Sequence, residues 1–92
     1  MNKSELIIAL AEKTDIPVEN AKTVVETMVS LMKEQLMEGG RIEIRGFGSF
    51  EMREYRAYTG RNPKTGKSVQ VKPKRMPFFK CGLDLKEQLN SD

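Results

Sequence analysis

Residues 59–66, with the sequence TGRNPKTG, constrain the fold more than any other segment of the chain. The segment combines two glycines and one proline with basic residues, and it has no acidic and no aliphatic side chain. On either side, residues 50–56 and 68–72 have the composition of strands. Turn-forming residues between two strand patterns predict the tip of a two-stranded β-ribbon.

Such a ribbon has few apolar residues near its tip, and a lone two-stranded ribbon is marginally stable in water. The distribution of charge along the chain indicates which kind of partner stabilises the ribbon. Residues 1–40 contain four Lys or Arg against seven Asp or Glu, a net charge of −3. Residues 53–80 contain nine Lys or Arg against one acid, Glu54, a net charge of +8. This asymmetry predicts a polyanionic partner that binds one face of the protein.

The composition limits the remaining possibilities. A chain of 92 residues is one small domain, with a core small enough that oligomerisation would help it. Cys81 is the single cysteine and histidine is absent, so we expect no internal disulfide, no zinc site, no other metal and no cofactor. The sequence has neither a signal-peptide pattern nor an apolar run of about 18 residues, so we expect a cytoplasmic protein without a membrane span.

The first forty residues predict two helices. The first covers residues 3–14, with Asn2 as its N-cap and Pro17 disfavouring helical geometry at the residue before it. The second covers residues 18–37 and ends at Gly39 and Gly40. It has a wide apolar face, which consists of Ala21, Val24, Val25, Met28, Leu31, Met32 and Leu36.

The rest of the chain predicts a sheet and a short helix. Residues 41–45 alternate as a half-buried strand with Ile42 and Ile44 toward the helices, and residues 46–50 form a tight turn with two aromatic side chains. The arm extends over about residues 55–74. Pro73 and Pro77 place the returning strand at a sheet edge or bend it. A C-terminal helix covers residues 82–90. The predicted organisation is one α+β domain over residues 1–92, with a helical dimerisation body at 1–40 and the sheet and arm at 41–80.

The sequence GFGSF at residues 46–50, followed by TGRNPKTG, resembles the HU / integration host factor family of bacterial histone-like DNA-bending proteins. The resemblance extends over nearly the whole chain, from Asn2 and Lys3 to Gly82. Within the family, the run RIEIRGFGSF at residues 41–50 is most similar to the beta subunits of integration host factor.

The resemblance implies an intertwined dimer with a helical body, a β-sheet saddle and one β-ribbon arm per chain. The arms wrap double-stranded DNA through the minor groove, and a proline near each tip wedges between base pairs. In this chain the wedge is Pro63, and Glu43 lies with Arg45 on the saddle. The implied DNA-binding residues are Lys3, Arg45, Arg53, Arg56, Arg61, Asn62, Pro63, Lys64, Lys67, Lys72, Lys74 and Arg75.

Four positions depart from the family pattern. Tyr55 and Tyr58 stand where family members commonly have arginine on the outgoing strand of the arm. Leu83 replaces a common lysine after Gly82, and Cys81 replaces a proline or serine. Leu83 removes a phosphate contact near the body, and we expect Cys81 to be an ordinary helix-entry position. On the arm, Arg53 and Arg56 partly compensate for the two tyrosines, at different points of the strand alternation.

The sequence therefore predicts a DNA-bending and DNA-compacting protein of the nucleoid. Two alternatives remain at this point: a sequence-preferring subunit of a heterodimer, and a binder of structured RNA or single strands. The partner chain is either a second copy or a paralogue. An enzyme such as a nuclease is disfavoured, because the chain lacks histidine as a general base and has no carboxylate cluster for a two-metal site.

Overall fold

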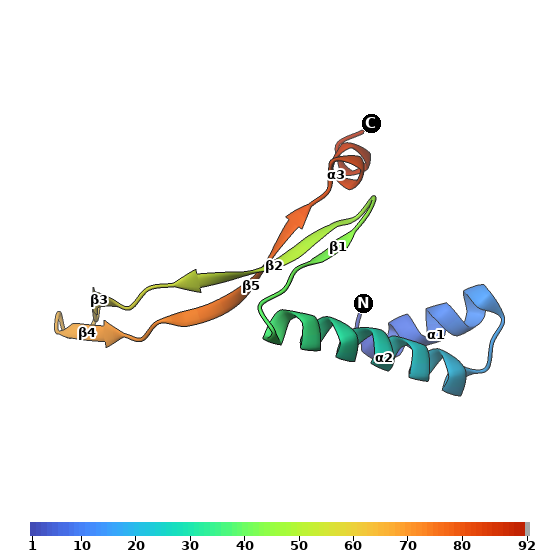
Figure 1. The fold of residues 1–92 in the computed structure, drawn as a ribbon, viewed down its shortest axis with the longest axis horizontal. Coiled ribbons are helices and arrows are strands. Elements are labelled where there is room, and N and C mark those ends of the chain that lie inside the picture. Colours follow the sequence, from blue (N-terminus) through green and yellow to red (C-terminus); the bar gives the residue numbers. More distant parts are fainter. Residues whose placement is uncertain (92) are drawn as a thin grey trace.

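The computed structural model describes residues 1–91 and confirms an α+β fold (Figure 1). Asp92, the last residue of the predicted domain, lies outside the described residues. Two helices lie side by side, a sheet leads away from them into a long ribbon, and a short helix ends the chain. The elements are α1 Lys3–Thr14, α2 Val18–Met37, β1 Ile42–Ile44, β2 Gly48–Tyr55, β3 Tyr58–Arg61, β4 Ser68–Val71, β5 Lys74–Cys81 and α3 Leu83–Leu89.

The helical hairpin begins and turns where the sequence predicts. The Asn2 side-chain oxygen accepts a hydrogen bond from the Glu5 backbone N–H at 2.8 Å, which satisfies one of the unpaired donors of the first turn of α1. After Thr14 the chain leaves the helix at Asp15, which adopts a left-handed conformation with φ of 53°. Pro17 then precedes the first residue of α2.

The end of α2 is a Schellman motif, in which two hydrogen bonds run backwards from the residues after the helix. The Gly40 N–H donates to the Gln35 carbonyl, and the Gly39 N–H donates to the Leu36 carbonyl, both at 3.0 Å. Gly39 has φ of +81°, a conformation that costs glycine far less than any residue with a Cβ. The predicted glycine stop is confirmed.

The sheet has the order β1-β2-β5 and is antiparallel throughout. Strand β1 is shorter than the predicted 41–45, because the chain turns at Gly46 and the Phe47 N–H bonds back to the Ile44 carbonyl at 3.0 Å. Ile42 is half-buried, whereas Ile44 remains 39% exposed. The register places both isoleucines on the side of β2 that carries Phe50 and Met52 and turns toward α2, as predicted, although Ile44 is less covered there than Ile42.

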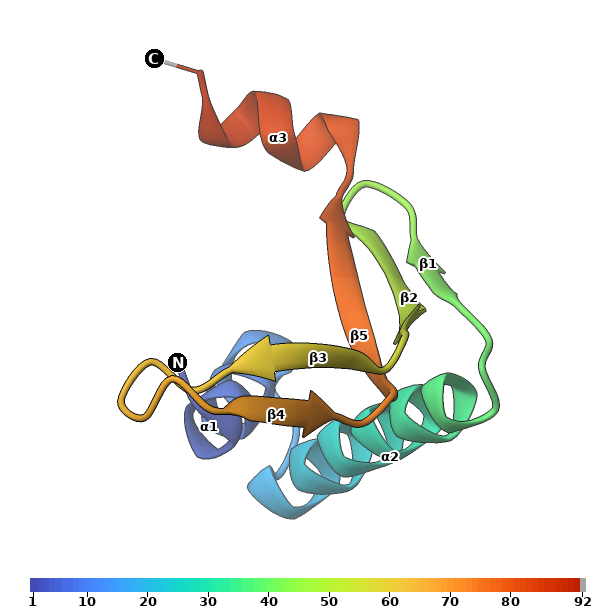
Figure 2. The same cartoon turned by 90° about the vertical axis from the view of Figure 1, so that its left-hand side faces the viewer.

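Strands β2 and β5 continue into β3 and β4 as one long hairpin with an interruption. Pairing stops after Tyr55 opposite Lys74 and resumes with Tyr58 opposite Val71, so two residues on each side are unpaired in the same overall register. Pro73, which has no N–H to donate, lies in this gap. Figure 2 shows β3 and β4 running across the direction of β2 and β5. Pro77 is different, because it pairs opposite Met52 inside the edge strand β5.

The buried core is small. Ile7 and Ala11 of α1 pack against Ala21 and Val25 of α2, with Leu10 and Ile16 partly buried beside them. A second apolar cluster joins the aromatic rings of Phe47, Phe50 and Phe79, whose centroids lie 4.9–6.5 Å apart. An added Cβ at Gly48 would lie 2.5 Å from the Lys80 carbonyl oxygen and 2.7 Å from the Phe79 ring, so this cluster requires glycine there.

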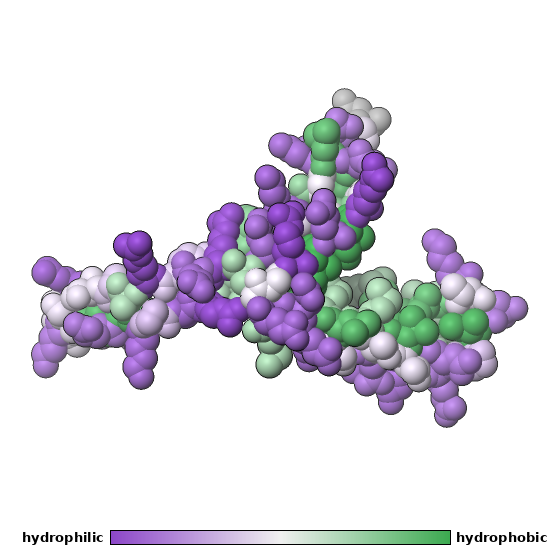
Figure 3. Space-filling view, in the orientation of Figure 1, coloured by the Kyte–Doolittle hydropathy of each residue, from purple (hydrophilic) through white to green (hydrophobic). Residues whose placement is uncertain are grey.

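Much of the apolar surface is uncovered in the single chain. Figure 3 shows hydrophobic side chains over the helices and beneath α3, while hydrophilic ones dominate the ribbon. On the wide face of α2, Val24, Met28 and Leu31 are 44%, 55% and 59% exposed, and Phe47 of the aromatic cluster is 44% exposed. Exposed apolar area of this extent marks a surface that binds another molecule.

Candidate nucleic-acid interface

The register of β2 and β5 sorts their side chains onto two faces, because directly paired residues of antiparallel strands point the same way. One face turns toward α2: Met52 and Pro77, which pair with each other, line a hollow with Leu36 and Met37 of that helix. We call the other side the open face. Its paired residues on the two strands are Ser49, Glu51, Arg53 and Tyr55 with Lys80, Phe78, Met76 and Lys74.

Arg53 is the cation of the open face that packs against an aromatic ring. Its guanidinium carbon lies 3.4 Å from the centroid of the Phe78 ring, so the two groups stack. A stacked guanidinium is attracted by the ring face and keeps its N–H donors free around its edge. With Lys74 and Lys80 on the same face, this arrangement favours the binding of an anion such as phosphate.

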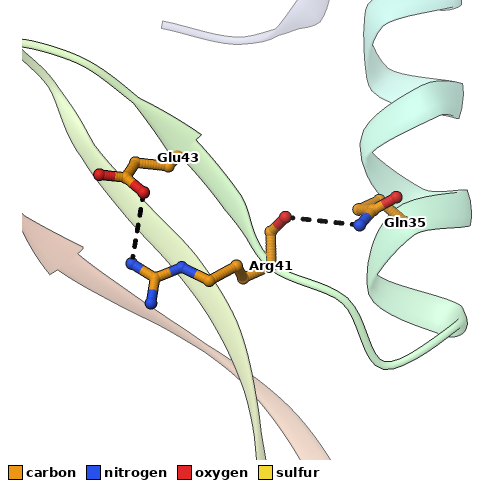
Figure 4. Close-up of polar contacts among 3 residues, drawn as sticks. All are labelled: Gln35, Arg41 and Glu43. Carbon is orange, nitrogen blue, oxygen red and sulfur yellow. Dashed lines mark hydrogen bonds and ion pairs between the residues drawn. The ribbon is translucent and has the colours of Figure 1, made fainter.

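The start of β1 carries a small polar network (Figure 4). Arg41 Nη2 lies 3.7 Å from Glu43 Oε2, and Gln35 Nε2 of α2 donates to the Arg41 carbonyl oxygen at 3.5 Å. Both partners of the ion pair are more than half exposed, so the pair contributes little to stability. Glu43 pairs opposite Ser49, which places its side chain on the open face.

The distal part of the ribbon is also two-faced. Tyr58 opposite Val71 and Gly60 opposite Val69 form an apolar side, whereas Thr59, Arg61, Ser68 and Gln70 form a polar side. A Cβ added at Gly60 would lie 3.5 Å from Tyr58 Cε2 and 3.8 Å from Val71 Cγ2. The tyrosine ring therefore lies over the glycine. Tyr58 is 60% exposed and Val69 is 44% exposed, which leaves an apolar stripe accessible on the arm.

The tip is held by Asn62. Its N–H donates to the Lys67 carbonyl at 2.9 Å, its carbonyl accepts from the Gly66 N–H at 2.7 Å, and its side-chain oxygen accepts from the Lys64 N–H at 2.9 Å. Asn62 is half-buried by these contacts, whereas Pro63 is exposed at the turn. The geometry presents a rigid apolar ring to the exterior of the ribbon.

Nine of the twelve predicted site residues fall into three groups. Arg53 and Lys74 share the open face, and Arg61, Asn62, Pro63, Lys64 and Lys67 gather at the tip. Arg56 and Lys72 lie at the interrupted segment.

Three predicted residues lie elsewhere. Lys3 is on α1, where its Nζ is 3.5 Å from Glu26 Oε2. Arg45 follows β1. Arg75 pairs opposite Glu54 on the side of the ribbon that faces α2, and it donates from Nη2 to the Leu36 carbonyl at 3.4 Å.

Sequence reasoning missed Phe78, Val69 and Val71 as residues of this surface. In the sequence, each of them has only the pattern of an ordinary strand residue. Their place on the open face or the apolar stripe follows only from the register of the strands. Among residues 1–91, no group of three or more His, Cys, Asp or Glu side chains is placed to hold a metal ion, and no helix of that part is long and apolar enough to span a membrane.

A family model described as "Bacterial DNA-binding protein" matches residues 1–90. The chain belongs to this family. It is 47% identical to integration host factor subunit beta of Marinobacter nauticus over 91 residues, which cover 98% of this chain and 93% of the relative. The predicted resemblance to the HU / integration host factor family is thereby confirmed.

Solved structures agree with this assignment. The fold is similar to Anabaena HU in a cocrystal with DNA, with a TM-score of 0.89, 36% identity and complete coverage of both chains. It is also similar to the V42I mutant of HU from Thermotoga maritima, with a TM-score of 0.72 and 32% identity over 98% of this chain and 100% of the other.

Proposed function

We propose that this protein bends and compacts double-stranded DNA by inserting its β-ribbon into the minor groove, with Pro63 as the wedge at the tip. The observation that carries the proposal is the protruding basic ribbon whose tip, fixed by the hydrogen bonds of Asn62, exposes the proline ring. A rigid ring without an N–H can replace base stacking at one step, and the cost of unstacking is offset as the bent duplex meets more basic surface.

The remaining contacts follow the placement of the cations. On the open face, Arg53 and Lys74 near the arm root and Lys80 near the other end of β5 bind phosphates. Arg61, Lys64 and Lys67 bind phosphates or groove edges around the tip. Glu43, whose side chain lies on the open face, and Arg45, which follows β1, contact the duplex there. We assign no catalytic step to these residues and place the protein in the cytoplasm, on the nucleoid.

The protein acts as a dimer. Its exposed α2 face and aromatic cluster form one apolar surface that a second chain covers, either another copy or a paralogous subunit. The helices then form the body, the sheets form the saddle, and each chain supplies one arm. This arrangement is supported by the name of the Marinobacter nauticus relative, which is a subunit, and by the likeness to HU.

The decisive experiment compares bending with binding. Pro63→Ala should reduce end-to-end shortening of an end-labelled duplex, measured by fluorescence energy transfer at saturating protein. Affinity for a short straight duplex should change by less than about tenfold, or about 1.4 kcal/mol, because the charges remain. Ser68→Ala, close to the tip on β4, is the matched control and should bend as the wild type does. Equal shortening with Pro63→Ala and wild type would show that Pro63 is only a turn residue.

A further inference from the structure

The C-terminal end of α2 is a site of uncompensated negative charge. The last carbonyls of a helix carry a partial negative charge, which basic side chains in the last turn usually balance. Here the last turn, residues 34–37, contains no basic side chain, and Glu34 and Glu38 add two acids. A cation from elsewhere in the fold is therefore favoured at this end of the helix.

Arg75 of β5 supplies that cation. Its Nη2 donates to the Leu36 carbonyl oxygen at 3.4 Å, a bond between residues 39 positions apart in the chain. The same nitrogen would lie 3.3 Å from a Cβ added at Gly39, so the guanidinium sits directly over the Schellman motif. Arg75 also shares a hollow with Lys33, Leu36 and Met37 of α2.

The contact between Arg75 and α2 is important because of where Arg75 lies in the ribbon. Arg75 is the second residue of β5, which begins immediately after the unpaired segment that contains Pro73. Figure 1 shows the end of α2 beneath the point where β2 and β5 leave the body, and Figure 2 agrees from the side. A bond from this point to the helix joins the root of the arm to the body.

We infer that Arg75 is a positioning residue, which fixes the direction of the arm by capping α2, rather than a DNA-contacting cation. This inference rests on the proposed function, since the arm matters only as the DNA-binding element. The sequence assigned Arg75 to the DNA contacts together with Lys74. The structure separates them, because adjacent residues of a strand point to opposite faces and only Lys74 lies on the open face.

The test measures arm direction without DNA and charge contribution with DNA. Thr59→Cys in a Cys81→Ser background places one spin label on each arm of the dimer, and electron–electron double resonance then gives the distribution of arm-to-arm distances. Arg75→Met removes the charge and the donors but keeps an apolar stem. We expect it to widen the distribution, while the matched variant Lys74→Met leaves the distribution unchanged.

Salt dependence separates the two roles again. Lys74→Met should make the slope of log K against log salt shallower by about 1.8, from about 0.9 per phosphate on each of two arms. Arg75→Met should leave the slope unchanged and lower affinity chiefly for long duplexes that need both arms. An unchanged distance distribution in Arg75→Met would overturn the inference, whatever the slope.

Two further results complete the design. If Arg75→Met does not fold, the same distances are measured in Arg75→Lys. This variant keeps the charge but has a shorter reach and no guanidinium fork, so we expect the same broadening. Absence of any arm-to-arm distance in the labelled parent protein would instead contradict a dimer of two copies of this chain, so the two failures are distinguishable.

Discussion

At the scale of single residues, the open face shows how an apolar side chain contributes to a charged surface. Phe78 is half-buried, and the Arg53 guanidinium lies over its ring. A free arginine side chain loses rotamer freedom when it binds phosphate, and stacking removes part of that loss before DNA arrives. Phe78 therefore holds Arg53 in a binding-competent orientation.

Replacing Phe78 tests this role directly. A cation–π contact at an exposed site is worth about 0.5–1 kcal/mol, so Phe78→Leu should weaken DNA binding by roughly two- to fivefold per arm. The salt slope should be unchanged, because no cation is removed. Phe78→Tyr, which keeps the ring, is the control and should bind as the wild type does.

A double-mutant cycle with Arg53→Gln, read from binding isotherms, completes the test. If Phe78 acts through Arg53, Phe78→Leu should have no further effect once Arg53 is removed. Additive losses would show that Phe78 contributes independently of Arg53.

At the scale of elements, the ribbon combines charge with an apolar stripe. Residues 53–80 carry nine basic side chains, which makes eighteen in a dimer. If about half of them contact phosphate, log K for DNA should fall against log salt with a slope of about −8. A slope shallower than about −3 would show that most of these charges are not engaged.

Tyr58 is the position on that stripe where charge can be restored. The resemblance to the family implies that arginine is common at this position, and the tyrosine lies over Gly60 and is exposed. Tyr58→Arg should steepen the salt slope by up to about 1.8 in the dimer, whereas Tyr58→Phe should leave it unchanged. Both slopes are read from fluorescence anisotropy titrations at several salt concentrations. An unchanged slope in Tyr58→Arg would mean that this side of the ribbon does not face the duplex.

The same elements show what sequence can predict. The bounds of α1 and α2 were predictable, because Asn2, Pro17 and the Gly39–Gly40 pair act locally through caps and backbone conformations. The ribbon and its tip were predictable for the same reason. The face on which each arm cation lies was not, because it depends on pairing between residues such as Glu54 and Arg75, far apart in the chain.

At the scale of the whole molecule, the chain has too little core to stand alone. Among the apolar side chains of residues 1–91, only those of Ile7, Ala11, Ala21 and Val25 are buried. Meanwhile the α2 face and the aromatic cluster remain open, and the molecule extends over 57 × 36 × 29 Å. A compact chain of this length would bury a larger fraction of its apolar surface. Folding and association are therefore expected to be one step.

This coupling has a measurable signature. For a folded dimer that unfolds to single chains, a tenfold rise in protein concentration contributes about 1.4 kcal/mol to stability. For a unit of about 180 residues that corresponds to a rise in the thermal midpoint of roughly 3–6 °C. Scanning calorimetry over a hundredfold range of concentration measures the shift, and sedimentation equilibrium gives the mass. A dimer mass for the purified chain would show that a second copy suffices. A concentration-independent midpoint with a monomer mass would contradict the coupling, because the exposed face of α2 would then be stable in water.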